Sequence, residues 1–330
     1  MTSQSSTVDC DDKDDGENGA DVKPGDVASC VPTIACRNDY DVFIEKYPQP
    51  GPMAQAYEAH RTARNADKRA ILESTNAVVP DNILSGIRLR GEPPEYDPRN
   101  CISVWCRPTA AVADLVEHVQ KRLLCVVHKN LSGGDDPAAR PGEPAYDRDG
   151  ARGGLWTAPR ANLHMTALEV IHSAPPSVTD SQAQRLKPLI KDILRAPEQG
   201  AVLVHPILSY DQNALALSFL PAPTDTYTYH HLRRDLARDI AATGVHVEPR
   251  YVVPSAHVTI ARFISNLSCP VSDLLAEIDD INRELEDWYR CAVPGTEWAV
   301  GAERGIECHN GRIWYGAGGH CLGSGSIRAV

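Results

Sequence analysis

Long apolar runs are missing from this chain of 330 residues. A membrane-spanning helix requires roughly 20 consecutive apolar residues, and no stretch approaches that length. The first residues, Met1-Thr2-Ser3-Gln4, also open without an apolar run. We therefore expect neither membrane insertion nor secretion, and we expect an intracellular protein, either cytoplasmic or nuclear.

Paired cysteines are also missing. Ten cysteines are scattered along the chain, and none forms a Cys-x-x-Cys pair. This excludes a zinc ribbon and a thioredoxin-like redox motif. Cys308-His309 and His320-Cys321 have suitable residue types for zinc, but their Gly-rich spacing matches no common zinc site. We expect reduced thiols, no metal and no cofactor.

The chain has fewer basic residues (33 Lys and Arg) than acidic residues (44 Asp and Glu), which gives a formal net charge of −11. Residues 1–35 contain eight acidic residues and two lysines, which leaves −5 for the rest of the chain. The tail has too few apolar residues to offset its ordering entropy, and we expect disorder there. The mildly acidic body lacks the basic stripe that follows a nucleic-acid backbone, which argues against long nucleic-acid tracts and leaves a nucleotide or one RNA end as ligand.

Strand and helix patterns alternate along the rest of the chain, so we expect a mixed fold of strands and helices. Residues 36–100 form a helical N-terminal segment, which precedes a domain over 101–330. A Gly- and Pro-rich insert at 131–154 is too long for an ordinary connection and predicts a surface loop or a lid. The expected strands are 102–106, 163–171, 201–208, 214–220, 256–263, 298–307 and 312–315, and the expected helices are 110–127, 180–194, 229–243 and 273–289. His309-Asn310-Gly311 predicts the turn of the last hairpin.

Two of the expected strands carry the same short motif, His164-Met165-Thr166 and His257-Val258-Thr259. Side chains alternate along a strand, so the histidine and the threonine of each motif share one face. They lie about 6.6 Å apart, close enough to contact one phosphate together. Two such strands facing each other would bring two imidazoles and two hydroxyls to one ligand.

This set of groups is sufficient to cleave a phosphodiester without a metal. A neutral histidine accepts the proton of the attacking water or hydroxyl, and a protonated histidine gives one to the leaving oxygen. Imidazole serves both purposes because its pKa of about 6.5 lets both forms exist near neutrality. The threonine hydroxyls would bind the non-bridging oxygens.

Chance does not explain the motifs well. Twelve histidines and fifteen threonines give about 0.5 random His-x-Thr matches in 330 residues, and the sequence contains three. The third, His60-Arg61-Thr62, lies in a charged helical run, where such a pair does not share a face. The other reading is that His164 and His257 are two unrelated core histidines with incidental threonines.

The paired motifs resemble the mark of the two-histidine (2H) phosphoesterase superfamily, from about Ile102 to the end of the chain. The resemblance implies a duplicated, two-lobed α+β fold with pseudo-twofold symmetry, antiparallel sheets facing a central cleft and helices outside. It also implies His164 and His257 as the acid and base, with Thr166 and Thr259 as phosphate ligands. His257-Val258-Thr259-Ile260-Ala261-Arg262 is similar to the His-x-Thr-x-x-Arg form of the RNA-ligase-like branch. Arg262 is thus a candidate substrate ligand, although strict alternation puts it on the face opposite His257.

Aromatic residues near the motifs are further candidates. Trp156, Trp314 and Tyr315 are candidates to stack on a base or to hydrogen-bond a phosphate, and core packing is the other interpretation for Trp314. His230-His231 begins a helix and is expected to face solvent.

The sequence therefore predicts a monomeric, metal-independent phosphoesterase for a 2′,3′-cyclic phosphate or related phosphodiester. Whether the phosphate belongs to a nucleoside, an ADP-ribose derivative or an RNA terminus stays open. The alternatives are a non-catalytic module that binds a nucleotide or an RNA end, and an activity like that of 2′-5′ RNA ligases.

Overall fold

The computed structural model describes residues 39–91, 99–129, 153–195, 200–247 and 252–327. The chain divides into Met1–Cys36 and Arg37–Val330, and all described residues belong to the second unit. The acidic tail and nearly all of the 131–154 insert lie outside the described residues. No helix in the described ranges has the length and apolar content needed to cross a membrane.

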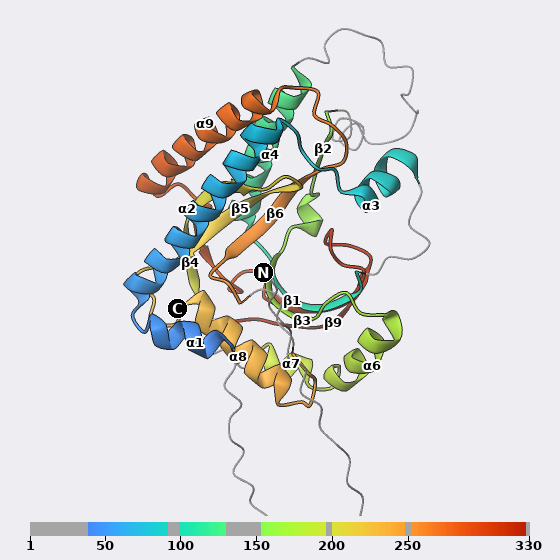
Figure 1. Ribbon diagram of the computed structural model, residues 1–330. Helices are drawn as coiled ribbons and strands as arrows, with labels where there is room; N and C mark the ends of the chain where they lie inside the picture. The colour runs from blue at the N-terminus through green and yellow to red at the C-terminus, as the bar shows by residue number, and fades with distance from the viewer. Residues whose placement is uncertain (1–38, 92–98, 130–152, 196–199, 248–251, 328–330) are drawn as a thin grey trace, which may run out of the picture. The chain divides into compact units, whose positions relative to one another are not determined.

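The described strands form one nine-stranded antiparallel sheet, so the α+β prediction is confirmed. The order is β7-β4-β5-β6-β3-β1-β8-β9, with β2 beside β6 (Figure 1). The strands are β1 Cys101–Cys106, β2 Leu155–Thr157, β3 Met165–Ile171, β4 Val202–Tyr210, β5 Ala214–Pro221, β6 Ala256–Phe263, β7 Glu297–Ala299, β8 Ile306–Gly311 and β9 Gly319–Gly325. The two motif strands, β3 and β6, are neighbours in the middle of this order.

Amphipathic helices cover the sheet. In α4, Val112, Leu115, Val119 and Leu123 recur at helical spacing and are buried, and Thr109 caps the helix through the Val112 N–H. The main helices of the domain are α4 Ala110–His128, α6 Pro176–Leu186, α7 Ile190–Ile193, α8 Tyr229–Ala241 and α9 Val271–Arg290. The single helix expected at 180–194 is two helices, because residues between Leu186 and Ile190 form turns.

The described part of the N-terminal segment contains α1 Asp39–Lys46, α2 Pro50–Thr75 and α3 Asn82–Ser85, followed by a π-helical turn Gly86–Arg90. Buried Arg61 of α2 donates to the backbone carbonyls of His205 and Ser218 on β4 and β5. Tyr57 of the same helix is hydrogen-bonded to His230 Nδ1 at 2.9 Å. The prediction that His230 faces solvent is therefore wrong, because α1 and α2 bury it.

The predicted position of the final hairpin is also wrong. His309, Asn310 and Gly311 are paired with β1 and belong to strand β8, so they do not form the turn. The chain reverses later, through Gly316 and Gly318, whose φ values of 76° and 86° suit glycine. The second strand of the hairpin is β9, and residues 312–315 belong to the connection.

Candidate active site

The two His-x-Thr motifs meet at one point of the sheet, where Met165 of β3 pairs with Val258 of β6 in antiparallel register. Continued by one residue in each direction, this register puts His164 across from Thr259 and Thr166 across from His257. Each histidine thus lies beside the threonine of the other motif. The paired Met165 and Val258 are fully buried, whereas Thr166 and His257 are exposed and His164 and Thr259 are half-buried.

Each motif histidine is oriented by a residue two positions before it. His164 Nδ1 lies 2.8 Å from the carbonyl oxygen of Asn162. A carbonyl only accepts hydrogen bonds, so Nδ1 carries the proton and Nε2 is left as the reactive nitrogen. His257 Nδ1 lies 3.0 Å from Ser255 Oγ, so Nδ1 is the nitrogen held by the protein in this motif as well.

Both histidines favour the neutral form in the free protein. Burial is the main cause for His164, with further repulsion from Arg107, His309 and His257, and the pKa falls to about 4. Burial among neighbouring groups and then the Arg64 guanidinium lower the pKa of His257. Because the His257 ring also keeps contact with solvent, its shift is smaller than complete burial would give. A bound phosphate anion would raise both values and allow one imidazole to hold a proton.

Arg262 lies on the same face of the sheet as His257 and Thr259, so the prediction from strict alternation is wrong. Thr259 pairs with Ala216 of β5, but the next pair is Ala261 with Leu215. Ile260 is therefore an extra residue, a β-bulge, and it reverses the alternation beyond the motif.

A corresponding irregularity occurs after the first motif. Thr166 pairs with Trp105, and the next pair is Leu168 with Val104, which leaves Ala167 extra. The two motif strands thus bend at the residue that directly follows each threonine. Glu169 consequently occupies the position in β3 that Arg262 occupies in β6.

Tyr315 contacts Arg262, whereas Trp156 is largely packed away. The Arg262 guanidinium carbon lies 5.5 Å from the centre of the Tyr315 ring. The Tyr315 hydroxyl donates to Asp81 at 2.7 Å and accepts from Arg99 at 2.6 Å. Burial and then Asp81 raise the pKa of Tyr315, so the hydroxyl is neutral and already engaged. Any contact of Tyr315 with a ligand would use the ring.

Trp156 lies directly across from Arg262 in the β2–β6 pairing, but it is buried. Its ring is 6.0 Å from that of Tyr315, in an edge-on arrangement. The structure therefore brings Trp156 and Tyr315 to the Arg262 end of the motif strands, where Trp156 is buried against Tyr315 and the Arg88 guanidinium.

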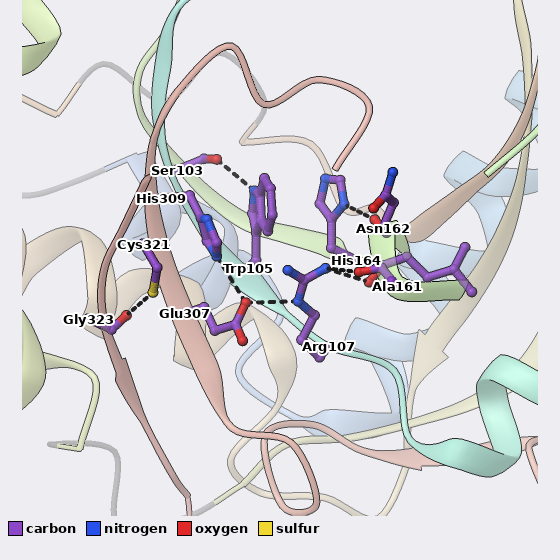
Figure 2. A network of polar contacts seen from close by, with 11 residues as sticks. Ser103, Trp105, Arg107, Ala161, Asn162, His164, Glu307, His309, Cys321 and Gly323 are labelled. Atoms are coloured by element: carbon purple, nitrogen blue, oxygen red, sulfur yellow. Dashed lines mark hydrogen bonds and ion pairs between the residues drawn. The ribbon is translucent and has the colours of Figure 1, made fainter. Parts of the chain in front are cut away.

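Sequence reasoning missed the group on which His164 rests. The indole of Trp105 stacks on the His164 imidazole at 4.0 Å between centroids and on His309 at 4.0 Å on its other side. Glu307 then joins His309 to Arg107, as Figure 2 shows. The available signal was weak: Ser103 and Trp105 alternate on a strand that the sequence predicted, but nothing in the sequence identified the neighbours of that strand.

The motif face offers no protein ligand set for a metal, since the described ranges contain no cluster of three or more His, Cys, Asp or Glu side chains suited to one. A surface hollow lined by Arg69, Leu275 and Asp279 lies between α2 and α9 and includes neither motif. Comparison with known proteins finds no family model and no curated protein that matches this chain.

Proposed function

We propose that this protein is a metal-independent phosphoesterase of the 2H type, which acts on a 2′,3′-cyclic phosphate or related phosphodiester of a nucleotide or RNA end. The observation that carries the proposal is the Met165–Val258 register. It brings two histidines and two threonines to one place, with Nδ1 of each histidine tied to the residue two positions earlier. Two imidazoles with available Nε2 atoms are the minimum set for acid and base catalysis at one phosphorus.

The reaction uses both protonation states of histidine. One neutral imidazole removes a proton from water as the water oxygen bonds to phosphorus. The bond from phosphorus to one ribose oxygen breaks, and the other histidine, protonated in the bound complex, gives that oxygen a proton. The product is a phosphomonoester beside a free ribose hydroxyl. Thr166 and Thr259 bind the non-bridging oxygens and hold the phosphate in line.

We also propose that the fold consists of two lobes related by a pseudo-twofold axis. The eight-strand path of the sheet divides into β7-β4-β5-β6 and β3-β1-β8-β9, which meet at the two motif strands. The matching bulges at Ala167 and Ile260 support a relation between the halves. The bulge at Ile260 also supports Arg262 as a ligand for the substrate, because it turns this guanidinium toward the motif face.

The direct test is a product assay with chelator-treated protein. A nucleoside, an ADP-ribose derivative and an RNA oligonucleotide, each with a cyclic phosphate, are incubated separately, and products are identified by phosphorus NMR. We expect conversion of at least one cyclic diester to a monoester, with kcat unchanged by the chelator. Loss of activity that Zn²⁺ or Mg²⁺ restores would rule out the metal-free scheme. Tight binding without turnover would identify a binding module instead.

The loop that supports His164 provides a second test. A Cβ at Gly316 would overlap the backbone carbonyl of Asn162, the group that orients the His164 ring. We expect Gly316→Ala to lower kcat by roughly 10- to 100-fold, since small displacements of catalytic groups have effects of this size.

Gly244→Ala is the matched control for this variant. Gly244 has a φ of 81°, similar to the 76° of Gly316, but a Cβ there would meet no atom within 4 Å. It adds backbone strain of about 1 kcal/mol without a clash. Equal kcat values for the two variants would show that the Asn162 carbonyl does not position His164.

A further inference from the structure

Arg107 follows directly after β1 and contacts the chain segment that directly precedes His164. Its Nη1 donates to the carbonyl oxygens of Leu163 at 3.1 Å and Ala161 at 3.2 Å. These residues belong to the segment that leads into His164. The guanidinium carbon also lies 4.9 Å from the centre of the Trp105 ring, on which His164 stacks. One side chain therefore touches both the backbone and the ring that define the place of this imidazole (Figure 2).

The Trp105 ring has contacts at its edge and on both of its faces. Its indole N–H donates to Ser103 Oγ at 2.8 Å, and the ring is buried between His164 and His309. His309 Nε2 lies 2.9 Å from Glu307 Oε2, and the same oxygen accepts from Arg107 Nε at 2.8 Å. Arg107 and His309 thus share one carboxylate oxygen, which closes a ring of contacts around the indole.

We propose that Arg107 is a positioning residue for His164, acting through the carbonyls of Ala161 and Leu163 and through the Trp105–His309–Glu307 stack. The proposal rests on the proposed function, since it supposes that the exact place of the His164 ring matters for turnover. Arg107 itself does not contact the substrate in this account. Its side chain is 12% exposed, and all of the contacts named above are within the protein.

The guanidinium shape suits this task. Its planar fork donates in several fixed directions at once, toward Glu307 on one side and toward two carbonyls on the other. A lysine at this position would keep the positive charge but would offer a single nitrogen, which cannot reach all three acceptors in the same geometry. The Arg107→Lys variant therefore keeps the positive charge and removes the geometry, so it distinguishes the two roles of this side chain.

The charge of Arg107 also bears on the protonation of His164. The groups that face this imidazole are Arg107 from the end of β1, His309 from β8 and His257 from β6, together with the Asn162 carbonyl. Glu307 offsets part of this positive charge through its contacts with Arg107 and His309. Arg107 therefore favours the neutral imidazole, which is the form that a base requires.

The test compares Arg107→Gln and Arg107→Lys in the full chain with wild type and with Arg69→Gln. Arg69 is also an arginine with several hydrogen bonds, here to the carboxylates of Glu73 and Asp279, but it lies on the surface between α2 and α9. Two readouts are used: steady-state turnover of the cyclic phosphate, and the NMR resonance of the His164 ring proton. The second is independent of activity, because a ring stacked on an indole shows an upfield ring-current shift.

For Arg107→Gln we expect kcat to fall roughly 10- to 100-fold with KM changed less than about 3-fold, the pattern of a misplaced catalytic group. The His164 resonance should move toward that of an unstacked histidine, and its pKa should rise. Arg107→Lys should also lose turnover and ring-current shift, but with a smaller change in pKa. Arg69→Gln should match wild type in turnover, in the ring-current shift of His164 and in the pKa of His164.

The proposal is overturned if folded Arg107→Gln keeps the wild-type ring-current shift, or if Arg107→Lys restores full turnover so that charge alone explains the effect. The NMR result decides the question even for a protein that turns over no cyclic phosphate. If the wild-type protein turns over no cyclic phosphate, the proposed function is contradicted. A displaced His164 resonance in Arg107→Gln would still support the positioning role of Arg107.

Discussion

Replacing either His164 or His257 by alanine is expected to lower turnover at least about 100-fold, the low end of what a positioned acid or base contributes. Each substitution removes one of the two proton carriers and leaves the phosphate ligands Thr166 and Thr259 in place. Because the two histidines act in the same step, the double variant should be little slower than either single variant. Steady-state kinetics with the best cyclic phosphate of the panel measures all three.

The chance match in α2 supplies the control for these substitutions. His60-Arg61-Thr62 has the same residue pattern but lies on a helix. His60→Ala should therefore turn over the substrate at the wild-type rate. A folded His257→Ala protein with near-normal activity would remove this histidine from the mechanism, and effects that simply multiply in the double variant would argue against a shared step.

Acidification is expected to destabilise the fold strongly through His230. This imidazole is fully buried among Tyr40, Phe43 and Tyr57. Burial and then the nearby Arg233 lower its pKa to about 2. The unfolded chain, with a pKa of about 6.5, takes up the proton first, so stability is fully present above pH 6.5 and is lost as pH falls below it. Between pH 7.5 and 4.5 the free energy of unfolding should drop by about 2–3 kcal/mol from this residue alone.

Urea unfolding at several pH values checks this expectation. His230→Leu removes the titrating group and should flatten the dependence on pH over this window. Tyr57→Phe is the control, because it removes the 2.9 Å hydrogen bond to His230 but keeps the imidazole. It should lower stability at every pH while leaving the slope unchanged. A slope that survives in His230→Leu would assign the acid sensitivity to other groups.

Local sequence pattern predicted most of the elements that form the site. Alternation identified β6 at its observed bounds and β3 within two residues, and the spacing of Val112, Leu115 and Val119 identified α4. These signals are strong because each element buries one face, which leaves a period in the sequence. The direct pairing of β3 with β6 was not predicted, because the two motif strands were expected to face each other and not to be neighbours in one sheet.

The face on which Arg262 lies could not be predicted in the same way. A β-bulge is a mismatch between two strands, and the register of β6 against Ala216 and Leu215 of β5 is not encoded in β6 alone. The turn expected at Asn310-Gly311 failed for a related reason. Pairing of Gly311 with Cys101 continues the ladder through residues with strong turn propensity.

Contacts between distant segments account for the remaining differences. His230 is buried because α1 and α2 pack over it, and its hydrogen-bond partner Tyr57 lies 173 residues earlier in the sequence. Arg107 and Glu307 are 200 residues apart in sequence. No periodicity in either segment predicts such a pair. The contacts that support His164 could therefore be identified only from the structure.

The pH dependence of turnover tests most directly the claim that His164 and His257 hold opposite protonation states at one phosphodiester. For wild type we expect a bell-shaped profile of kcat, whose limbs belong to the coupled pair. In kcat/KM, which reports the free protein, the acid limb should lie below pH 6.5, since both pKa values are lowered. Each single alanine variant should keep one limb and lose the other. A bell of unchanged shape in His164→Ala and His257→Ala would contradict the two-histidine mechanism.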